Sequence, residues 1–144
     1  MATKGTDFMS TTRIEYRDAA GALLAYKIPA EPAPGLTPYS DDADFIQALH
    51  WRYDGGKKLQ AHEHLRVPRT ATHTQEVIVV LRGRVRTTVY DAAHRVVATV
   101  EVAPGEAMAL LQHGHGYEIL EDDTRVLEIK NGPYPGAEAD RVRF

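Results

Sequence analysis

The stretch that decides the fold is LQAHEHLRVPRTATHTQEVIVVL, residues 59–81. It begins and ends with residues typical of β-strands. In a strand, residues i and i+2 point to the same side, so His62 and His64 are predicted to project together. Glu76 opens the most apolar run of the chain, EVIVVL. If this strand and the preceding loop fold back on each other, two imidazoles and one carboxylate can converge.

This combination of side chains predicts a metal site. Imidazole nitrogens with one carboxylate oxygen suit Fe, Zn, Ni or Mn. A fourth candidate ligand lies downstream in His113-Gly114-His115-Gly116. His115 is the preferred choice, because flanking glycines let the backbone turn sharply and approach a ligand closely. His113 is the rival, and both histidines could instead be surface loop residues.

Glu76 shares its predicted strand face with Ile78 and Val80. An ionised carboxylate on a buried face is costly unless another group compensates its charge. A divalent cation would do so. The alternative is that Glu76 pairs with Arg66 or Arg69, or that it lies at the wet end of the strand.

Length and composition restrict the class of protein. With 144 residues, one domain is expected. A hydrophobic content of 43%, a charged content of 26% and a net charge of -3 are typical of a globular protein and argue against nucleic acid as a partner. The absence of cysteine excludes disulfides, thiolate metal sites and cysteine nucleophiles.

No part of the sequence predicts a membrane segment. Apolar runs stay below membrane-spanning length, and the first residues lack the apolar core of a signal peptide. We therefore expect a cytoplasmic protein with a flexible N-terminus over residues 1–11.

Short apolar runs at nearly regular intervals, separated by Gly and Pro turns, predict a β-sandwich or barrel. The proline-rich segment 29–44 is expected to be loop, and residues 45–49 either form a short helix or run into a strand over residues 47–53. The predicted strands cover residues 13–17, 22–28, 74–81, 84–90, 96–102, 107–111, 117–120 and 125–130.

Two motifs in this chain resemble those of the cupin superfamily. The first is His62-Glu63-His64 followed by Glu76, with Gly83 seven residues after that glutamate. The second is Pro104-Gly105-Glu106 leading to His115. The chain leaves a longer gap before Glu76 than cupins usually do, and we interpret residues 65–74 as an insertion at the barrel mouth. It also lacks the usual proline before the second-motif glycine, which keeps His113 and His115 both open as ligands.

The resemblance covers about residues 45–130 and implies an all-β, double-stranded β-helix (cupin or jelly-roll) barrel. The sequence adds an N-terminal β-hairpin extension to that barrel. Residues 12–144 would form the single cupin domain, with its core motifs within residues 59–130. The resemblance also implies one divalent metal ion. Fe2+ is the expected metal and Zn2+, Mn2+ or Ni2+ are alternatives, bound by His62, His64, Glu76 and His115.

The function expected from this resemblance is that of a metal-dependent enzyme acting on a small polar molecule, either a non-haem metal oxygenase or a metal-assisted isomerase or lyase. Candidate catalytic residues are Tyr117, two residues after His115, and Arg69, which could bind a carboxylate; His113 would contact substrate if His115 binds metal. The alternatives are a non-catalytic module that binds a small ligand and a metal-free sugar epimerase or isomerase. In the latter, His64 or His115 would be the general base and Tyr117 the acid.

Several other residues receive weaker expectations. Gln75 and Trp51 are minor candidates for the cavity wall, and His73 is a minor candidate ligand. His50 and His94 are expected to be structural or exposed. A homodimer is expected, with the hairpin over residues 13–28 as the exchanged element, because this hairpin must cover a sheet edge somewhere.

Overall fold

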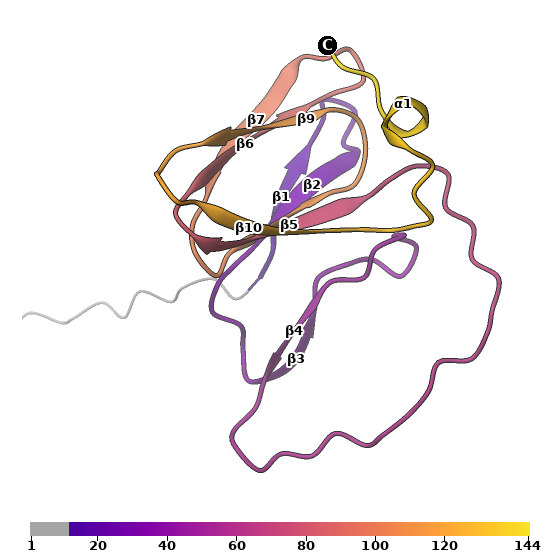
Figure 1. Ribbon diagram of the computed structural model, residues 1–144, viewed down its shortest axis with the longest axis vertical. Coiled ribbons are helices and arrows are strands. Elements are labelled where there is room, and N and C mark those ends of the chain that lie inside the picture. Colours follow the sequence, from indigo (N-terminus) through magenta and orange to yellow (C-terminus); the bar gives the residue numbers. More distant parts are fainter. Residues whose placement is uncertain (1–11) are drawn as a thin grey trace, which may run out of the picture.

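The computed structural model describes residues 12–144, so the predicted flexible segment 1–11 lies outside the described residues. The described chain is all-β, as predicted, with ten strands and one short helix (Figure 1). Its strands form three antiparallel sheets, none of which closes into a barrel. The coarse prediction of an antiparallel β-fold is therefore confirmed.

The largest sheet has five strands in the order β1-β2-β8-β5-β10. Its strands are β1 (Ile14–Arg17), β2 (Leu23–Ile28), β8 (Ala107–Leu110), β5 (Glu76–Arg82) and β10 (Arg125–Lys130). The β1–β2 hairpin, predicted as an extension, is an integral part of this sheet because β2 pairs with β8. The hairpin thus covers the β8 edge of its own chain.

The second sheet has three strands in the order β7-β6-β9 and faces the first (Figure 1). They are β7 (Val96–Val102), β6 (Val85–Tyr90) and β9 (His115–Ile119). Alternate residues of both sheets point inward and bury a common core. Its buried members are Leu24, Ala25, Ile78, Val80, Val85, Val89, Val100, Val102, Met108 and Leu110.

A separate apolar cluster lies on the other face of the five-stranded sheet. There Val77 of β5 packs with Tyr26, Tyr39 and Ile46. This cluster explains why the start of β5 is apolar at consecutive positions, because the strand is buried on both faces. The nearby hairpin of β3 (Gly35–Pro38) and β4 (Leu49–Arg52) forms the third sheet.

The remaining predicted elements agree with the structure to within a few residues, with two exceptions. Residues 45–49 form no helix; the competing prediction of a strand there is closer, since β4 occupies Leu49–Arg52. Strand β3 was not predicted, because it lies within the proline-rich segment and ends at Pro38. Its edge position tolerates the proline, which lacks a backbone donor.

The turn between β5 and β6 depends on Gly83. Its φ is +76°, a conformation that favours glycine. A Cβ atom at this position would lie 2.2 Å from Thr124 Oγ1 and 2.8 Å from the Thr124 Cα. Gly83 therefore serves both the tight turn and the close approach of the loop that leads into β10.

A long irregular segment connects β4 to β5 and bows away from the sheets (Figure 1). We call residues 57–69 of this segment the arm. Within the described chain, the arm's hydrogen bonds are local: Lys57 N donates to Asp54 O at 3.3 Å, and His62 Nδ1 lies 3.1 Å from Gln60 O. The chain rejoins the sheets at His73, whose Nε2 donates to the Leu111 carbonyl at 2.8 Å.

The C-terminal part leaves the sheet, as predicted, and includes the single-turn helix α1 (Ala137–Asp140). Its last residue, Phe144, stacks on His94 with ring centroids 3.7 Å apart. No helix within residues 12–144 has the length and apolar character required to span a bilayer.

Candidate functional site

The candidate site is a cluster around the carboxylate of Glu76, at the start of β5. The Glu76 residue is only 5% exposed. His115 Nε2 lies 2.8 Å from Glu76 Oε1, and the Tyr117 hydroxyl donates to the same oxygen at 2.6 Å. The ammonium group of Lys130 lies 3.4 Å from the other oxygen, Oε2.

Strand register explains why these residues meet. Lys130 of β10 stands directly opposite Glu76 of β5 in the five-stranded sheet. His115 and Tyr117 are two residues apart on β9 of the facing sheet, so both point to one side. Their partners on β6 are Val89 and Thr87, which are buried in the interior. The cluster therefore bridges the two sheets across the space between them.

The electrostatics of the cluster keep Glu76 ionised. Burial alone would raise the pKa of Glu76, but hydrogen bonds from His115 and Tyr117, with the positive charge of Lys130, lower it to about 2. Burial of the Tyr117 hydroxyl raises the pKa of that group, and the adjacent Glu76 carboxylate raises it further. The Tyr117 hydroxyl consequently stays protonated at neutral pH and serves as a hydrogen-bond donor, although 39% of the residue is exposed.

Two further features complete the surroundings. The Lys130 ammonium also lies 2.7 Å from a Glu128 carboxylate oxygen, so it bridges two acids. In the interior, Thr87 Oγ1 is buried and has no hydrogen-bond partner among the described residues. Thr87 of β6 lies directly opposite Tyr117 of β9. The Thr87 hydroxyl without a hydrogen-bond partner therefore belongs to the residue next to Tyr117 in the neighbouring strand.

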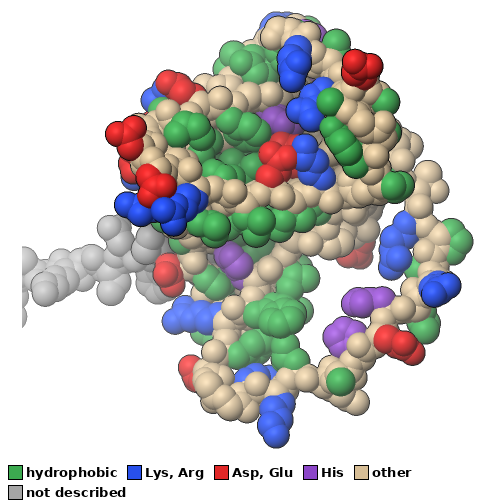
Figure 2. All heavy atoms as spheres, in the orientation of Figure 1, with side chains coloured by type: hydrophobic (Ala, Val, Ile, Leu, Met, Phe, Trp, Pro, Cys, Tyr) green, Lys and Arg blue, Asp and Glu red, His purple; other side chains and the backbone are tan. Residues whose placement is uncertain are grey.

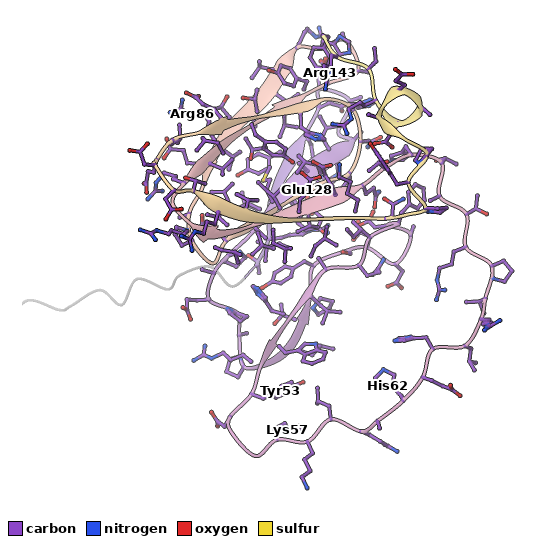
Figure 3. All side chains as sticks on the ribbon, viewed as in Figure 1. Tyr53, Lys57, His62, Arg86, Glu128 and Arg143 are labelled. Carbon is purple, nitrogen blue, oxygen red and sulfur yellow. The ribbon has the colours of Figure 1, made fainter. Side chains whose placement is uncertain are left out.

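The structure brings together two of the four predicted metal ligands, Glu76 and His115, and separates them from the other two. His62 and His64 lie on the arm, with their ring centroids 5.2 Å apart. Figure 3 shows His62 far from Glu128, which lies beside the cluster on β10. Among residues 12–144, no group of three or more His, Cys, Asp or Glu side chains is gathered as a metal site.

The prediction that His62 and His64 lie side by side agrees with the position of their rings, but the arm that carries them forms no strand. A strand needs a hydrogen-bonded neighbour, and the arm has none in the described chain. Of the two rival histidines, His115 contacts Glu76 and His113 does not. His113 is exposed and has a φ of +63°, at the turn before β9.

The other predicted residues lie outside the cluster. Arg69 lines an open groove of about 970 Å³, together with Asp44, His73 and Asp140. The alternative pairing of Glu76 with Arg66 or Arg69 is not observed; the Lys130 ammonium lies beside the Glu76 carboxylate instead. Gln75 is a structural residue, since its Oε1 accepts hydrogen bonds from the backbone of Phe45 and Ile46.

Trp51 is exposed on β4, also away from the cluster. His50 contacts the Tyr39 hydroxyl and His94 stacks on Phe144, so both have structural contacts, as expected.

Sequence reasoning missed Lys130 and Glu128. The signal was present, because the strand Arg125-Val126-Leu127-Glu128-Ile129-Lys130 alternates and places Val126, Glu128 and Lys130 on one face. The sequence alone does not indicate that this strand pairs with β5 and places Lys130 opposite Glu76.

Comparisons of the chain with protein-family models, with curated proteins and with solved structures gave no match.

Proposed function

We propose that this protein is a metal-dependent enzyme of the cupin type that acts on a small polar molecule, with Glu76 and His115 as ligands of one divalent ion. The supporting observation is the buried Glu76 carboxylate with His115 Nε2 at 2.8 Å, set between two antiparallel sheets. An oxygen and a nitrogen donor already aimed at one point fit a divalent ion such as Fe2+, Zn2+, Mn2+ or Ni2+. We place Fe2+ first.

His62 and His64 are proposed as the remaining ligands. Their rings already lie together, and the arm that carries them has no hydrogen bond or ion pair to the sheets in the described chain. Moving the arm over the space between the sheets therefore breaks few contacts. The two imidazoles would complete a site of three histidines and one carboxylate, which leaves coordination positions for substrate.

The residues of the cluster would then act on a bound molecule. An ion held there by Glu76 and His115 would supply Lewis-acid chemistry to a substrate oxygen, or a binding position for dioxygen. If the Glu76 carboxylate served as a ligand, the Tyr117 hydroxyl would lose its present acceptor and could donate a hydrogen bond to a substrate oxygen. The Lys130 ammonium, held by Glu128, supplies a positive charge beside that position. Oxygenase and isomerase or lyase chemistry both suit this arrangement.

A second candidate is metal-free acid–base chemistry on a sugar, as in nucleotide-sugar epimerases or isomerases. It is favoured by one observation: His115 and Tyr117 contact the same Glu76 oxygen, and their rings lie 5.3 Å apart. In this reading Glu76 orients His115 as the general base, and Tyr117 is the general acid.

Elemental analysis of the purified protein, before and after anaerobic loading with Fe, Mn, Ni or Zn, tests the proposal. The expected result is one ion per chain, with loss of the ion in a His62→Ala/His64→Ala variant. His94→Ala is the control, because His94 lies outside the cluster. Absence of metal under all loading conditions, combined with catalysis that survives chelation, would favour the acid–base candidate.

A further inference from the structure

Apolar side chains of β9 and β10 point into the sandwich but remain exposed. In antiparallel pairs, residues directly opposite each other point to the same face. Ile119 of β9 stands opposite Val85 and Val126 of β10 stands opposite Val80, and both partners are buried in the common core. Ile119 and Val126 therefore point inward, yet they are 60% and 38% exposed. Within residues 12–144, the sandwich is consequently open between β9 and β10.

We call the space between Ile119 and Val126 and the Glu76 cluster the opening. Its long sides are β9 and β10, and the turn over residues 120–124, which joins these strands, closes one end. The contacts of Glu76 with His115 and Tyr117 close the other end. Figure 2 shows apolar side chains gathered between β9 and β10, with histidine, acidic and basic side chains at one end. A space closed at both ends accepts a molecule of limited length rather than a continuous polypeptide segment.

Hydrogen-bond donors gather at the cluster end of the opening. The Tyr117 hydroxyl and the Lys130 ammonium both lie beside the Glu76 carboxylate. Thr87, directly opposite Tyr117 on β6, has a buried hydroxyl with no hydrogen-bond partner among the described residues. A buried hydroxyl without a partner is costly, and a ligand oxygen at this end would supply one. An oxygen group is therefore the polar function that suits this end of the opening.

The strands set the length of the molecule that fits. His115 and Ile119 are four residues apart on β9, so the opening extends roughly 13 Å along the strand. An extended chain of about eight carbons is roughly 9 Å long, given zigzag carbon–carbon bonds of about 1.5 Å. Ile119 and Val126 provide apolar walls for such a chain. The opening therefore matches a medium-chain aliphatic body that ends in a single oxygen group.

We propose that the substrate of this protein is a medium-chain aliphatic molecule with one terminal oxygen group, an alcohol, an aldehyde or a carboxylic acid. Its oxygen lies at the Glu76 cluster beside Tyr117, and its chain lies in the opening between Ile119 and Val126. The small polar molecule of the proposed function is thereby specified as an amphiphile. Its role as a substrate rests on that proposed function, whereas the binding of an aliphatic chain in the opening does not.

Calorimetric titration of the whole chain with straight-chain alcohols, with EDTA present, tests the inference. The wild type should bind one 1-octanol per chain, about tenfold more tightly than 1-hexanol, because each buried methylene contributes about three- to fourfold. Ile119→Asp and Val126→Asp should each weaken 1-octanol binding at least about tenfold, since a charge beside an aliphatic chain is unfavourable. Val96→Asp is the matched control and should leave the affinity unchanged, because Val96 is 61% exposed on β7, the strand of that sheet farthest from β9. Absence of binding, an affinity independent of chain length, or equal weakening by all three variants overturns the proposal.

Titration with octanoate separates this inference from the proposed metal function. The carboxylates of Glu76 and Glu128 and the ammonium of Lys130 give the cluster a net charge of -1, which a bound Zn2+ would change to +1. Zn2+ should therefore tighten octanoate binding at least about tenfold. If 1-octanol binds as expected but Zn2+ leaves octanoate binding unchanged, the metal proposal fails while the aliphatic ligand stands. If Zn2+ binds stoichiometrically but neither 1-octanol nor octanoate binds, the aliphatic ligand is excluded while the metal proposal stands.

Discussion

His115 Nε2 lies 2.8 Å from Glu76 Oε1, although the two residues belong to different sheets. This contact links β5 of one sheet to β9 of the other, beside the core that both sheets share. It also occupies the point at which a metal ion would have to bind. Glu76 is therefore both a structural bridge between the sheets and the group on which the proposed chemistry depends.

Glu76→Gln should change the pH dependence of stability. The pKa of Glu76 is about 2 in the folded protein against an ordinary value of 4.5. Because the folded pKa is the lower one, the ionised form stabilises the fold above pH 4.5, and this contribution is lost as the pH falls toward 2. Its size is on the order of 3 kcal/mol. Chemical denaturation from pH 7 to pH 2 should show the difference between wild type and Glu76→Gln shrinking as pH falls. A constant difference would contradict this account.

Tyr117→Phe removes a hydrogen bond to a buried carboxylate. The expected loss in the free energy of unfolding at pH 7 is about 1.5–2 kcal/mol, since hydrogen bonds to charged groups exceed neutral ones. Tyr53→Phe is the control, because Tyr53 contacts Lys57 through its ring on the exposed part of the chain; its effect should stay within about 0.5 kcal/mol. Equal effects of the two substitutions in urea denaturation would argue against the Tyr117–Glu76 bond.

Gly83→Ala should be more damaging than Gly21→Ala. Both glycines have positive φ, +76° and +85°, so each alanine is strained by about 1–2 kcal/mol. At Gly83 the new Cβ would also meet the Thr124 backbone, whereas nothing lies within 4 Å of the corresponding position at Gly21. The additional cost at Gly83 is about 1–3 kcal/mol. Urea denaturation measures both, and similar losses for the two variants would show that the Thr124 contact relaxes.

Lys130→Met should strengthen metal binding. The Lys130 ammonium lies 3.4 Å from Glu76 Oε2 and competes with a divalent ion for that carboxylate. Removing a neighbouring positive charge should tighten binding of Zn2+ about tenfold in calorimetric titration, equivalent to roughly 1.4 kcal/mol. Lys27→Met, which removes a lysine paired with Glu106 instead, should leave the affinity unchanged. Weaker binding in Lys130→Met would show that Lys130 supports the site rather than competing with it.

The strands were predictable because their apolar alternation depends on local sequence. The predicted ranges of β7 and β10 equal their observed bounds, and the predicted range of β6 differs by one residue. Pairing was harder to predict, since it depends on residues far apart in the chain. Lys130 was overlooked for this reason: its partner Glu76 is brought to it by the β5–β10 register alone.

In the candidate site too, residues that local sequence patterns indicate were predictable, whereas contacts between distant parts of the chain were not. The residues that meet, Glu76, His115 and Tyr117, were all singled out from the sequence. Glu76 and His115 were chosen from the two motifs, and Tyr117 was chosen because it lies two residues after His115 on a predicted strand. The position of His62 and His64 was not predictable. Their segment alternates like a strand, but whether such a segment pairs, and with which edge, depends on surfaces that local sequence does not specify.

Calorimetric titration with Zn2+ is the most direct test of the central claim, that Glu76 and His115 hold a metal ion. Zn2+ is suitable because it binds nitrogen and oxygen ligands more tightly than Fe2+ does. The account predicts one ion per wild-type chain, affinity reduced at least about 100-fold in Glu76→Gln and in His115→Ala, and unchanged affinity in His94→Ala. Absence of stoichiometric binding to the wild type, or binding that survives in both cluster variants, would contradict it.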